Sequence, residues 1–384
     1  MLSLSKRTDS IAQSEIRAMT IECEKVHGIN LAQGVCDTAL PAAVAHEAKE
    51  AIDRGCNSYT RYDGIAELRY AIARKLCTYN GVKADPESQI IVSNGATGAF
   101  HCACLALLDP GDEVILFEPF YGYHVNTLLA TEAVPAYVSM HAPDWSFTED
   151  DLEAAVTPRT KGIMVNTPAN PSGKVFSTQE IEWIAAFAER HDLLVFTDEI
   201  YEYFLYDGRR HVTPAALPGM EHRTVAISGF SKTYSITGWR IGYTVSQPEW
   251  ARMIGYMNDL LYVCAPAPLQ AGAAAGLNLL TSEFYRQLAE EYAAKRDLLC
   301  AALEHAGIPT VPPQGAYYIL ADVSRLPGAT SKDRAMYLLD RTGVATVPGS
   351  AFFHGPQGEA FVRFCYAKSD AELEQACERL AELS

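Results

Sequence analysis

The chain has 384 residues, of which 48% are hydrophobic and 20% are charged, as is typical of a folded globular protein with room for two domains. Its formal net charge of −16 disfavours nucleic acids and anionic membranes as partners. The N-terminus lacks an apolar segment of signal-peptide length, and no window of about 18 apolar residues follows, so we expect a cytoplasmic protein.

The cysteines and histidines show no metal-binding pattern. The ten cysteines include no Cys-x-x-Cys pair, and the ten histidines include no His-Glu-x-x-His. We therefore expect reduced thiols that fill the core, and no metal site. The chain also lacks Gly-x-Gly-x-x-Gly and a Walker loop, which removes the usual support for a dinucleotide oxidoreductase or a nucleotide hydrolase.

The first predicted elements are helices over residues 10–27 and 40–54, each followed by a glycine. Between them, residues 29–35 form a short extended segment that contains Gly34. A glycine there is explained either by a strand-ending turn or by close approach of the backbone to a ligand.

From residue 89 onward strands alternate with helices, which predicts a largely parallel sheet with helices on both faces. The first strand, residues 89–94, ends in Gly95-Ala-Thr-Gly98, and a helix follows to Leu108. Small residues at a helix N-terminus form an anion site from backbone amides and the helix dipole. Glycine is also common in such turns without any ligand.

The next two strands lead into motifs rich in proline and aromatic residues. Residues 113–117 precede Glu118-Pro-Phe-Tyr-Gly-Tyr123, and residues 161–165 precede Asn166-Thr-Pro-Ala-Asn-Pro-Ser-Gly173. The prolines and the glycine of the second loop present Asn170 from a rigid support. Ser177 and Glu180 then form a capping box that begins the following helix.

Residues 193–197 form an apolar strand that ends in two carboxylates, Asp198 and Glu199, with Tyr201 close behind. A buried carboxylate requires a partner, such as a protonated ring nitrogen. A metal site is the alternative explanation of the paired carboxylates, although no histidine lies within the segment.

Residues 224–227 predict a buried strand that delivers Lys232 into the segment Ser231-Lys-Thr-Tyr-Ser-Ile-Thr-Gly-Trp-Arg-Ile-Gly242. Partial burial favours the neutral amine, which is a nucleophile toward carbonyl groups. Arg240, flanked by glycines, supplies a planar fork for a phosphate. An amine beside a phosphate site indicates pyridoxal phosphate held as a Schiff base, whereas a solvated surface lysine is the plainer alternative.

The last third of the chain predicts a smaller domain. A long amphipathic helix over residues 282–306 precedes strands or strand-turns at 314–320, 343–349 and 361–367, and Ser369 and Glu372 cap a terminal helix. Arg363 lies inside an apolar strand, so it needs either a bound carboxylate or a structural salt bridge. We predict a large domain at residues 45–285 and a small domain at 1–44 and 286–384.

The segment Ser231–Gly242 resembles the lysine signature of the class I and II aminotransferases, and the other motifs quoted above follow in family order over residues 10–384. The resemblance implies the fold type I architecture, in which a mostly parallel sheet flanked by helices is joined to a smaller α+β domain. It implies a pyridoxal 5'-phosphate enzyme that moves an amino group between an L-amino acid and a 2-oxo acid by a ping-pong mechanism. A homodimer with a shared active site is also implied.

The resemblance assigns roles to individual residues. Lys232 forms the Schiff base and moves the proton, Asp198 faces the pyridine nitrogen and Tyr121 stacks on the ring. The remaining assignments are Asn170 and Tyr201 at the phenolic oxygen, Gly95, Ala96, Thr97, Ser231 and Arg240 at the phosphate, Tyr59 at the phosphate of the partner subunit, and Gly34, Asn170 and Arg363 at the substrate. Many members have a phosphate-binding serine where this chain has Gly229.

Two alternatives remain open from the sequence. A lyase or specialised synthase would use the same site for elimination, and a non-catalytic ligand-binding or regulatory protein could be built on the same fold. Some aspartate-specific relatives carry a lysine at the position of Thr97, so a dicarboxylic substrate is disfavoured, although an arginine of the partner subunit could replace it. Four aromatic residues could line the pocket or fill the core: Tyr123, Tyr262, Tyr317 and Phe352.

Overall fold

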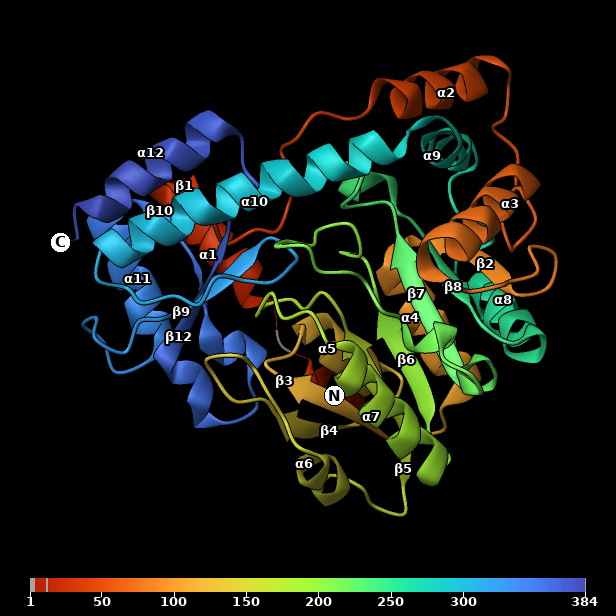
Figure 1. Cartoon of the computed structure of the whole chain (residues 1–384), viewed down its shortest axis with the longest axis horizontal. Helices are drawn as coiled ribbons and strands as arrows, with labels where there is room; N and C mark the ends of the chain where they lie inside the picture. Colours follow the sequence, from red (N-terminus) through yellow and green to blue (C-terminus); the bar gives the residue numbers. More distant parts are fainter. Residues whose placement is uncertain (1–3, 12, 384) are drawn as a thin grey trace.

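The computed structural model describes residues 4–11 and 13–383 of the chain, and a seven-stranded sheet forms its centre (Figure 1). The strand order is β2 (Ile90–Asn94), β8 (Ile241–Val245), β7 (Thr224–Gly229), β6 (Leu194–Asp198), β5 (Thr160–Asn166), β3 (Glu113–Glu118) and β4 (Val134–Ser139). β8 runs antiparallel to β2 and β7, and the other neighbours pair in parallel. The predicted largely parallel sheet is therefore confirmed.

Helices cover both faces of this sheet because successive side chains of a strand point to opposite faces. In β5, Ile163 and Val165 pack in the same apolar cluster as α7 (Thr178–Arg190). Met164, between them, belongs to the cluster of α4 (Gly95–Leu107) and α8 (Pro248–Tyr262). The continuous apolar runs of the sequence are explained by this burial on two sides.

A second, antiparallel sheet lies in the smaller part of the molecule, in the order β11 (Val347–Pro348), β12 (Phe361–Cys365) and β9 (Tyr318–Asp322). It is accompanied by α11 (Ser331–Thr342) and α12 (Asp370–Ala381). Figure 1 shows α10 (Ser282–His305) crossing from α9 (Ala267–Leu279) to α12, so this long helix joins the two parts. The apolar core is continuous between them, since one cluster includes both Ile163 of β5 and Leu339 of α11.

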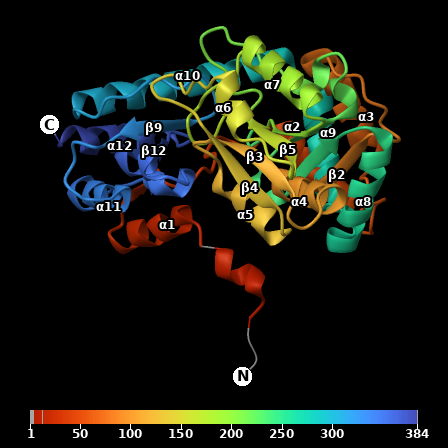
Figure 2. The same ribbon diagram turned by 90° about the horizontal axis from the view of Figure 1, so that it is seen from below.

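The N-terminal helix is shorter than predicted. A 3-10 turn occupies Lys6–Ser10, and the backbone at Ser14 is extended, so α1 spans only Glu15–Lys25. The prediction of one helix from residue 10 was wrong because it ignored this break. The extended segment after it is also short, since only β1 (Ile29–Asn30) pairs, with β10 (Val344–Ala345). Figure 2 shows α1 below the smaller part, beside α11.

The predicted helix starts can be compared with the observed caps. In α7 the Ser177 side chain accepts from the Glu180 amide and Glu180 returns the bond, so this capping box is confirmed. In α12 the structure records only the Ser369 half of the box. The other α-helices are α2 (Ala42–Asp53), α3 (Ala66–Lys75), α5 (Gly122–Ala130) and α6 (Glu149–Ala154), with a π-helical turn at Leu76–Asn80 and short 3-10 turns elsewhere. Within the described residues, none of the helices combines the length and the apolar character needed to cross a membrane.

Candidate active site

A cavity of about 480 Å³ opens at the carboxyl ends of β3, β5, β6 and β7. Ligand sites of open α/β sheets lie at this edge, because the loops that follow the strands converge there. Eleven of the thirteen predicted site residues line it: Gly34, Ala96, Thr97, Tyr121, Asn170, Asp198, Tyr201, Ser231, Lys232, Arg240 and Arg363. The two exceptions are Gly95 and Tyr59.

Lys232 follows β7 and is half-buried in the cavity wall. Its Nζ donates to the Gly34 carbonyl oxygen at 3.0 Å and lies 6.0 Å from the centre of the Tyr201 ring. Burial lowers the pKa of the Lys232 ammonium, and the positive charges of Arg240 and Arg363 lower it further. A neutral amine is thereby favoured, which is the form that attacks a carbonyl carbon.

Asp198 ends β6 and is buried, with its carboxylate open to the cavity. Its Oδ2 lies 2.9 Å from Nε2 of His124 in α5. The imidazole of His124 also packs edge-on against Tyr121, with ring centres 5.2 Å apart. His124 was not among the predicted site residues, although it follows the Glu118–Tyr123 motif directly, in the helix that begins there.

Residues 95–97, predicted to bind an anion, form the N-terminus of α4 beside the guanidinium of Arg240. Gly95 has φ 72°, and a Cβ there would come within 2.5 Å of Nη2 of Arg240, so the glycine lets the guanidinium pack against the turn. Arg240 donates to the Thr237 carbonyl oxygen at 2.9 Å, and it makes no ion pair with a carboxylate of residues 4–11 or 13–383. Backbone amides, a helix dipole and a cation without a carboxylate partner are groups that can bind an anion such as a phosphate.

The departure from the family pattern at Gly229 has a steric reason. A Cβ on Gly229 would lie 2.9 Å from the Ile241 carbonyl oxygen and 3.0 Å from Cα of Gly242, in the paired strand β8. A serine side chain therefore does not fit at this position. Ser231, which is buried and lines the cavity, provides a hydroxyl on the same segment.

Arg363 lies in β12 and is fully buried. It donates through Nη1 to Oδ1 of Asn170 at 2.8 Å and through Nη2 to the Ala32 carbonyl oxygen at 2.6 Å, while Nε has no partner. No carboxylate of the described chain pairs with it, so the alternative of a structural salt bridge is wrong. A buried guanidinium without a counter-ion is expected to bind an anion that enters the cavity.

The Gly34 backbone lies close to a tyrosine side chain, and its contact with the substrate stays a prediction. Its φ is not positive, and a Cβ would collide with the hydroxyl of Tyr318, which lines the same cavity. The Tyr318 hydroxyl lies 2.9 Å from that of Tyr201. Burial raises the pKa of the Tyr201 hydroxyl well above its usual range, so this group stays protonated and can donate a hydrogen bond.

Tyr59 is 82% exposed and does not line the cavity of its own chain. Of the four aromatic residues left open by the sequence, Tyr123 lines the cavity and stacks on Tyr121, with ring centres 5.3 Å apart. Tyr317 and Phe352 are buried, and neither lines the cavity. Tyr262 does not line it either and packs against the α4 and α8 core.

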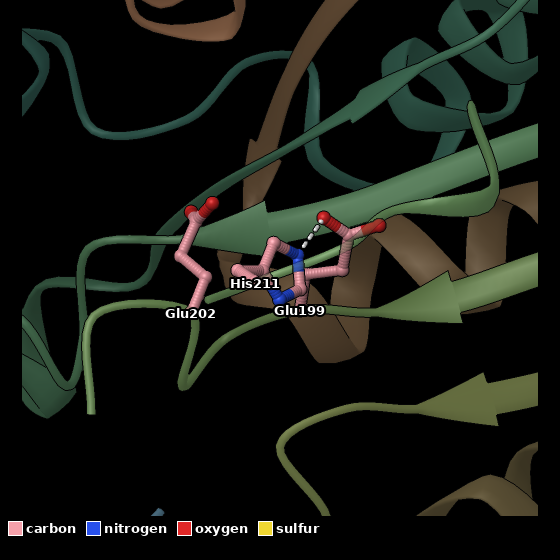
Figure 3. A group of neighbouring side chains, drawn as sticks. All are labelled: Glu199, Glu202 and His211. Carbon is pink, nitrogen blue, oxygen red and sulfur yellow. Dashed lines mark hydrogen bonds and ion pairs between the residues drawn. The ribbon is translucent and has the colours of Figure 1, made fainter. Parts of the chain in front are cut away.

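Next to Asp198, a separate cluster of Glu199, Glu202 and His211 places three potential ligand atoms within 4.8 Å of one another (Figure 3). Oε2 of Glu199 lies 2.7 Å from Nε2 of His211, and Oε1 accepts from Thr197 and Thr213. Burial alone would raise the pKa of Glu199, but His211 and the two hydroxyls together lower it.

Both carboxylate oxygens of Glu202 in this cluster also accept hydrogen bonds. Its Oε1 accepts from Ser228 at 2.9 Å, and its Oε2 accepts from Asn80 at 2.9 Å and from the Lys75 ammonium. Burial opposes the charge on Lys75, yet Glu202 outweighs this and raises the lysine pKa. With every carboxylate oxygen already bonded and a lysine beside Glu202, the cluster fits a structural ion-pair network better than a metal site.

Comparison with known proteins agrees with this geometry. A family model described as aminotransferase class I and II matches residues 26–380. The chain is 35% identical to aromatic-amino-acid aminotransferase 2 of Thermococcus litoralis and 36% identical to aspartate aminotransferase of Pyrococcus abyssi. Each alignment covers 100% of this chain and 98% of the relative.

The solved structure of N-succinyldiaminopimelate aminotransferase from Mycobacterium tuberculosis superposes with a TM-score of 0.96 at 33% identity, covering 100% of both chains. Fold, pocket and relatives thus agree on pyridoxal-phosphate-dependent transfer of an amino group between an amino acid and a 2-oxo acid. The chain belongs to the class I and II aminotransferase family and is a pyridoxal-phosphate-dependent aminotransferase.

Proposed function

We propose that this aminotransferase works through the residues of the described cavity, with Lys232 as the group that binds the cofactor and moves the proton. The main support is the half-buried Lys232 amine, whose pKa is lowered, at the carboxyl edge of the sheet. Arg240 and Arg363, two cations without carboxylate partners in the described chain, line the same cavity.

The residues fit pyridoxal phosphate. The α4 N-terminus with Ser231 and Arg240 would hold the phosphate, and Asp198 would face the pyridine nitrogen. Asn170 and Tyr201 would bind the phenolic oxygen, and Tyr121 would pack on the ring. When bound, the cofactor supplies the electron sink that stabilises negative charge at the substrate α-carbon.

The protein groups then divide the work on the substrate. Arg363, supported by Asn170, binds the α-carboxylate through two parallel hydrogen bonds. When it is not bound to the cofactor, the Lys232 amine would take the proton from the substrate α-carbon as a general base, and the resulting ammonium would act as the general acid. Because the same site serves the amino acid and the 2-oxo acid in turn, ping-pong kinetics are expected.

A homodimer is the proposed assembly, with Tyr59 serving the neighbouring subunit. The segment around Tyr59 is held against α8, since Asn258 Nδ2 donates to the Tyr62 carbonyl oxygen at 2.8 Å. The C-terminal end of α8 exposes Leu260, which is 78% accessible, and Leu261. Apolar side chains exposed on the helix that holds the Tyr59 segment support the proposal that a second subunit covers this surface.

Subunit complementation tests the shared site. Y59A and K232A are each expected to be inactive, but a mixed dimer contains one site with Lys232 from the first subunit and Tyr59 from the second. Activity should therefore return when the two variants are unfolded and refolded together. If Tyr59 served its own chain, no intact site would form, and the mixture would stay inactive.

A substrate panel tests the activity itself. The purified enzyme with cofactor is assayed with L-amino acids and 2-oxo acids, and product formation should require both partners. Ammonia release without an acceptor would instead indicate the lyase alternative. Borohydride reduction followed by mass spectrometry should place the cofactor on Lys232, and failure to label any lysine would support a non-catalytic protein.

The domain boundaries and the cellular location are proposed as the sequence predicts them. The division into a large unit, residues 45–285, and a small unit, residues 1–44 and 286–384, is supported by the sheets, since all seven strands of the large sheet lie in the first unit and the strands of the two smaller sheets lie in the second. The cytoplasmic location remains a prediction from the sequence.

A further inference from the structure

The connection between α2 and α3 carries Tyr59 and contains neither helix nor strand over residues 54–65, which we call the Tyr59 loop. The Tyr59 side chain is 82% exposed, so packing within its own chain does little to fix it. The position of its hydroxyl therefore depends on how the backbone of the Tyr59 loop is held.

One buried amide holds the Tyr59 loop at two points. Gln270 lies in α9 and is fully buried. Its Oε1 accepts from the Ile65 amide at 2.8 Å, and its Nε2 donates to Oγ1 of Thr60 at 3.3 Å and to the Ala265 carbonyl oxygen at 2.9 Å. Thr60 directly follows Tyr59 and Ile65 directly precedes α3, so Gln270 bonds the loop on both sides of its turn.

A glycine lets the backbone of the Tyr59 loop lie directly on Gln270. Gly64 has φ 94°, and a Cβ there would come within 2.9 Å of Oε1 of Gln270 and 2.6 Å of Cβ of Val92 in β2. The Asp63 carbonyl oxygen also accepts from the Val92 amide at 3.1 Å. The course of the loop therefore depends on contacts with both β2 and Gln270.

The third hydrogen bond of Gln270 reaches the connection between α8 and α9. Ala265, whose carbonyl oxygen accepts it, follows shortly after Leu260 and Leu261, the exposed residues of the surface proposed to be covered by a second subunit. Gln270 thus fixes the Tyr59 loop relative to that surface. A side chain that has to reach a ligand of another subunit requires such a fixed placement.

Gln270 does not line the cavity of its own chain, so any effect on cofactor binding must pass through the segments that it holds. We propose that Gln270 is a positioning residue that acts on the neighbouring subunit. It holds Tyr59 where the tyrosine hydroxyl can donate to the cofactor phosphate bound there. This inference rests on the proposed function, in which Tyr59 serves the neighbouring subunit.

Cofactor binding with and without the phosphate tests this role. Q270M keeps the length of the side chain and removes its hydrogen bonds. When the cofactor-free, full-length protein is titrated with pyridoxal 5'-phosphate, Q270M should raise Kd about 10-fold, because the hydrogen bond from Tyr59 to the phosphate is misplaced. Pyridoxal has no phosphate, so its Kd should change by less than about 2-fold. Equal losses for the two compounds would show a general structural effect and would overturn the proposal.

The matched control is Q247M. Gln247 donates through Nε2 to the His222 carbonyl oxygen at 3.1 Å and does not line the cavity. Because this amide bonds no part of the Tyr59 loop, Q247M should bind both compounds as wild type does. A loss of phosphate-dependent binding in Q247M as large as in Q270M would overturn the proposal.

A double-mutant cycle tests whether Gln270 acts through Tyr59. Y59F removes the hydroxyl that would bind the phosphate. The double variant Q270M/Y59F should then bind pyridoxal 5'-phosphate within about 2-fold of Y59F alone, since both changes remove the same interaction. Losses that multiply would mean that Gln270 acts by another route.

Hybrid dimers test the action between subunits. In a hybrid of Q270M and K232A subunits, purified through two different tags, the only Lys232 lies in the Q270M subunit. The Tyr59 that serves this site comes from the subunit with an intact Gln270. The pyridoxal 5'-phosphate concentration for half-maximal activity should therefore equal that of a hybrid of wild-type and K232A subunits. A value as high as that of the Q270M homodimer would overturn the proposal.

A milder variant keeps the proposal testable if Q270M does not fold. T60V removes the hydroxyl that Gln270 bonds on a half-buried residue, and it should raise Kd for pyridoxal 5'-phosphate about 3-fold to 5-fold without affecting pyridoxal. Failure of the proposed function would look different, because Y59A and K232A would then not complement each other. Complementation of that pair, together with a defect in the hybrid of Q270M and K232A, would refute only the role of Gln270.

Discussion

Two neighbouring carboxylates at the end of β6 belong to opposite kinds of charge cluster. Asp198 lines a cavity whose arginines, Arg240 and Arg363, lack carboxylate partners within the described chain. Glu199, the next residue, accepts hydrogen bonds from His211 and two threonine hydroxyls. The arginines of the first cluster are available to ligands, whereas all carboxylate oxygens of Glu199 and Glu202 already have partners within the protein.

The difference shows how buried charge indicates function. A charge that already has its partners stabilises or orients the fold, while a charge left unpaired in a cavity marks the place of a ligand group. Residue type and sequence position do not separate the two cases, since Asp198 and Glu199 are adjacent acids. The hydrogen-bond and ion-pair partners of the two side chains do separate them.

The largest effect on stability is expected from breaking the cluster of Glu199, Glu202 and His211. E202Q leaves the buried Lys75 ammonium uncompensated, so we expect the free energy of unfolding to fall by about 3–5 kcal/mol in urea denaturation. The double variant K75M/E202M removes both charges and should lose less. A stability of E202Q equal to wild type would show that this pair is not a structural ion pair.

For the charged residues of the cavity, the expected loss is in catalytic activity. D198N keeps the shape and the contact to His124 but removes the negative charge, so kcat/KM should fall about 10²-fold to 10³-fold. Its unfolding midpoint should stay close to wild type, because no lysine or arginine of the described residues forms an ion pair with Asp198. A large drop in stability with full activity would reverse the assignment of the two clusters.

Substitution of His124 is expected to reduce activity less than substitution of Asp198, because His124 affects the ligand site through its hydrogen bond to Asp198. H124F keeps the ring contacts with Phe100 and Tyr121 but cannot bond Asp198, and we expect kcat/KM to fall about 10-fold. H124Q places an amide near the position of Nε2 and should recover most of the activity. Equal losses in both variants would argue for packing as the role of this side chain.

The smallest effect concerns Lys232 in the cofactor-free protein. Its pKa is lowered in the folded state, mainly by burial, so protonation costs stability at neutral pH. K232M should therefore be more stable than wild type at pH 7, by about 1.4 kcal/mol for each unit by which the pKa is lowered. Wild type should gain stability as the pH rises above the lowered pKa, and the difference should vanish near pH 10.4. A difference independent of pH would mean that folding does not lower the pKa of this lysine.

Much of the fold could be predicted because its signals are local. Apolar runs with β-branched residues predicted β5, β6 and β7, and Ser177 with Glu180 predicted the start of α7. The beginning of α1 could not be placed, since no residue between 6 and 14 carries a strong break signal. Its actual start at Glu15 follows from the extended backbone at Ser14.

The candidate site was predicted to a similar extent and for a similar reason. Motifs at strand ends placed Asn170, Asp198 and Lys232 at one edge of the sheet, since parallel strands end on the same side. His124 was missed because its contact with Asp198 spans 74 positions in the chain.

By itself the sequence determined the architecture and the chemistry of the central motifs, because glycines, prolines and apolar periodicity act on the nearest neighbours along the chain. Only the tertiary structure decided which charges keep partners inside the protein: Lys75 meets Glu202, whereas Arg363 meets Asn170 and no acid of the described residues. Such pairings depend on how distant segments pack, and side chains more than a hundred positions apart become neighbours only when the sheet and helices have assembled.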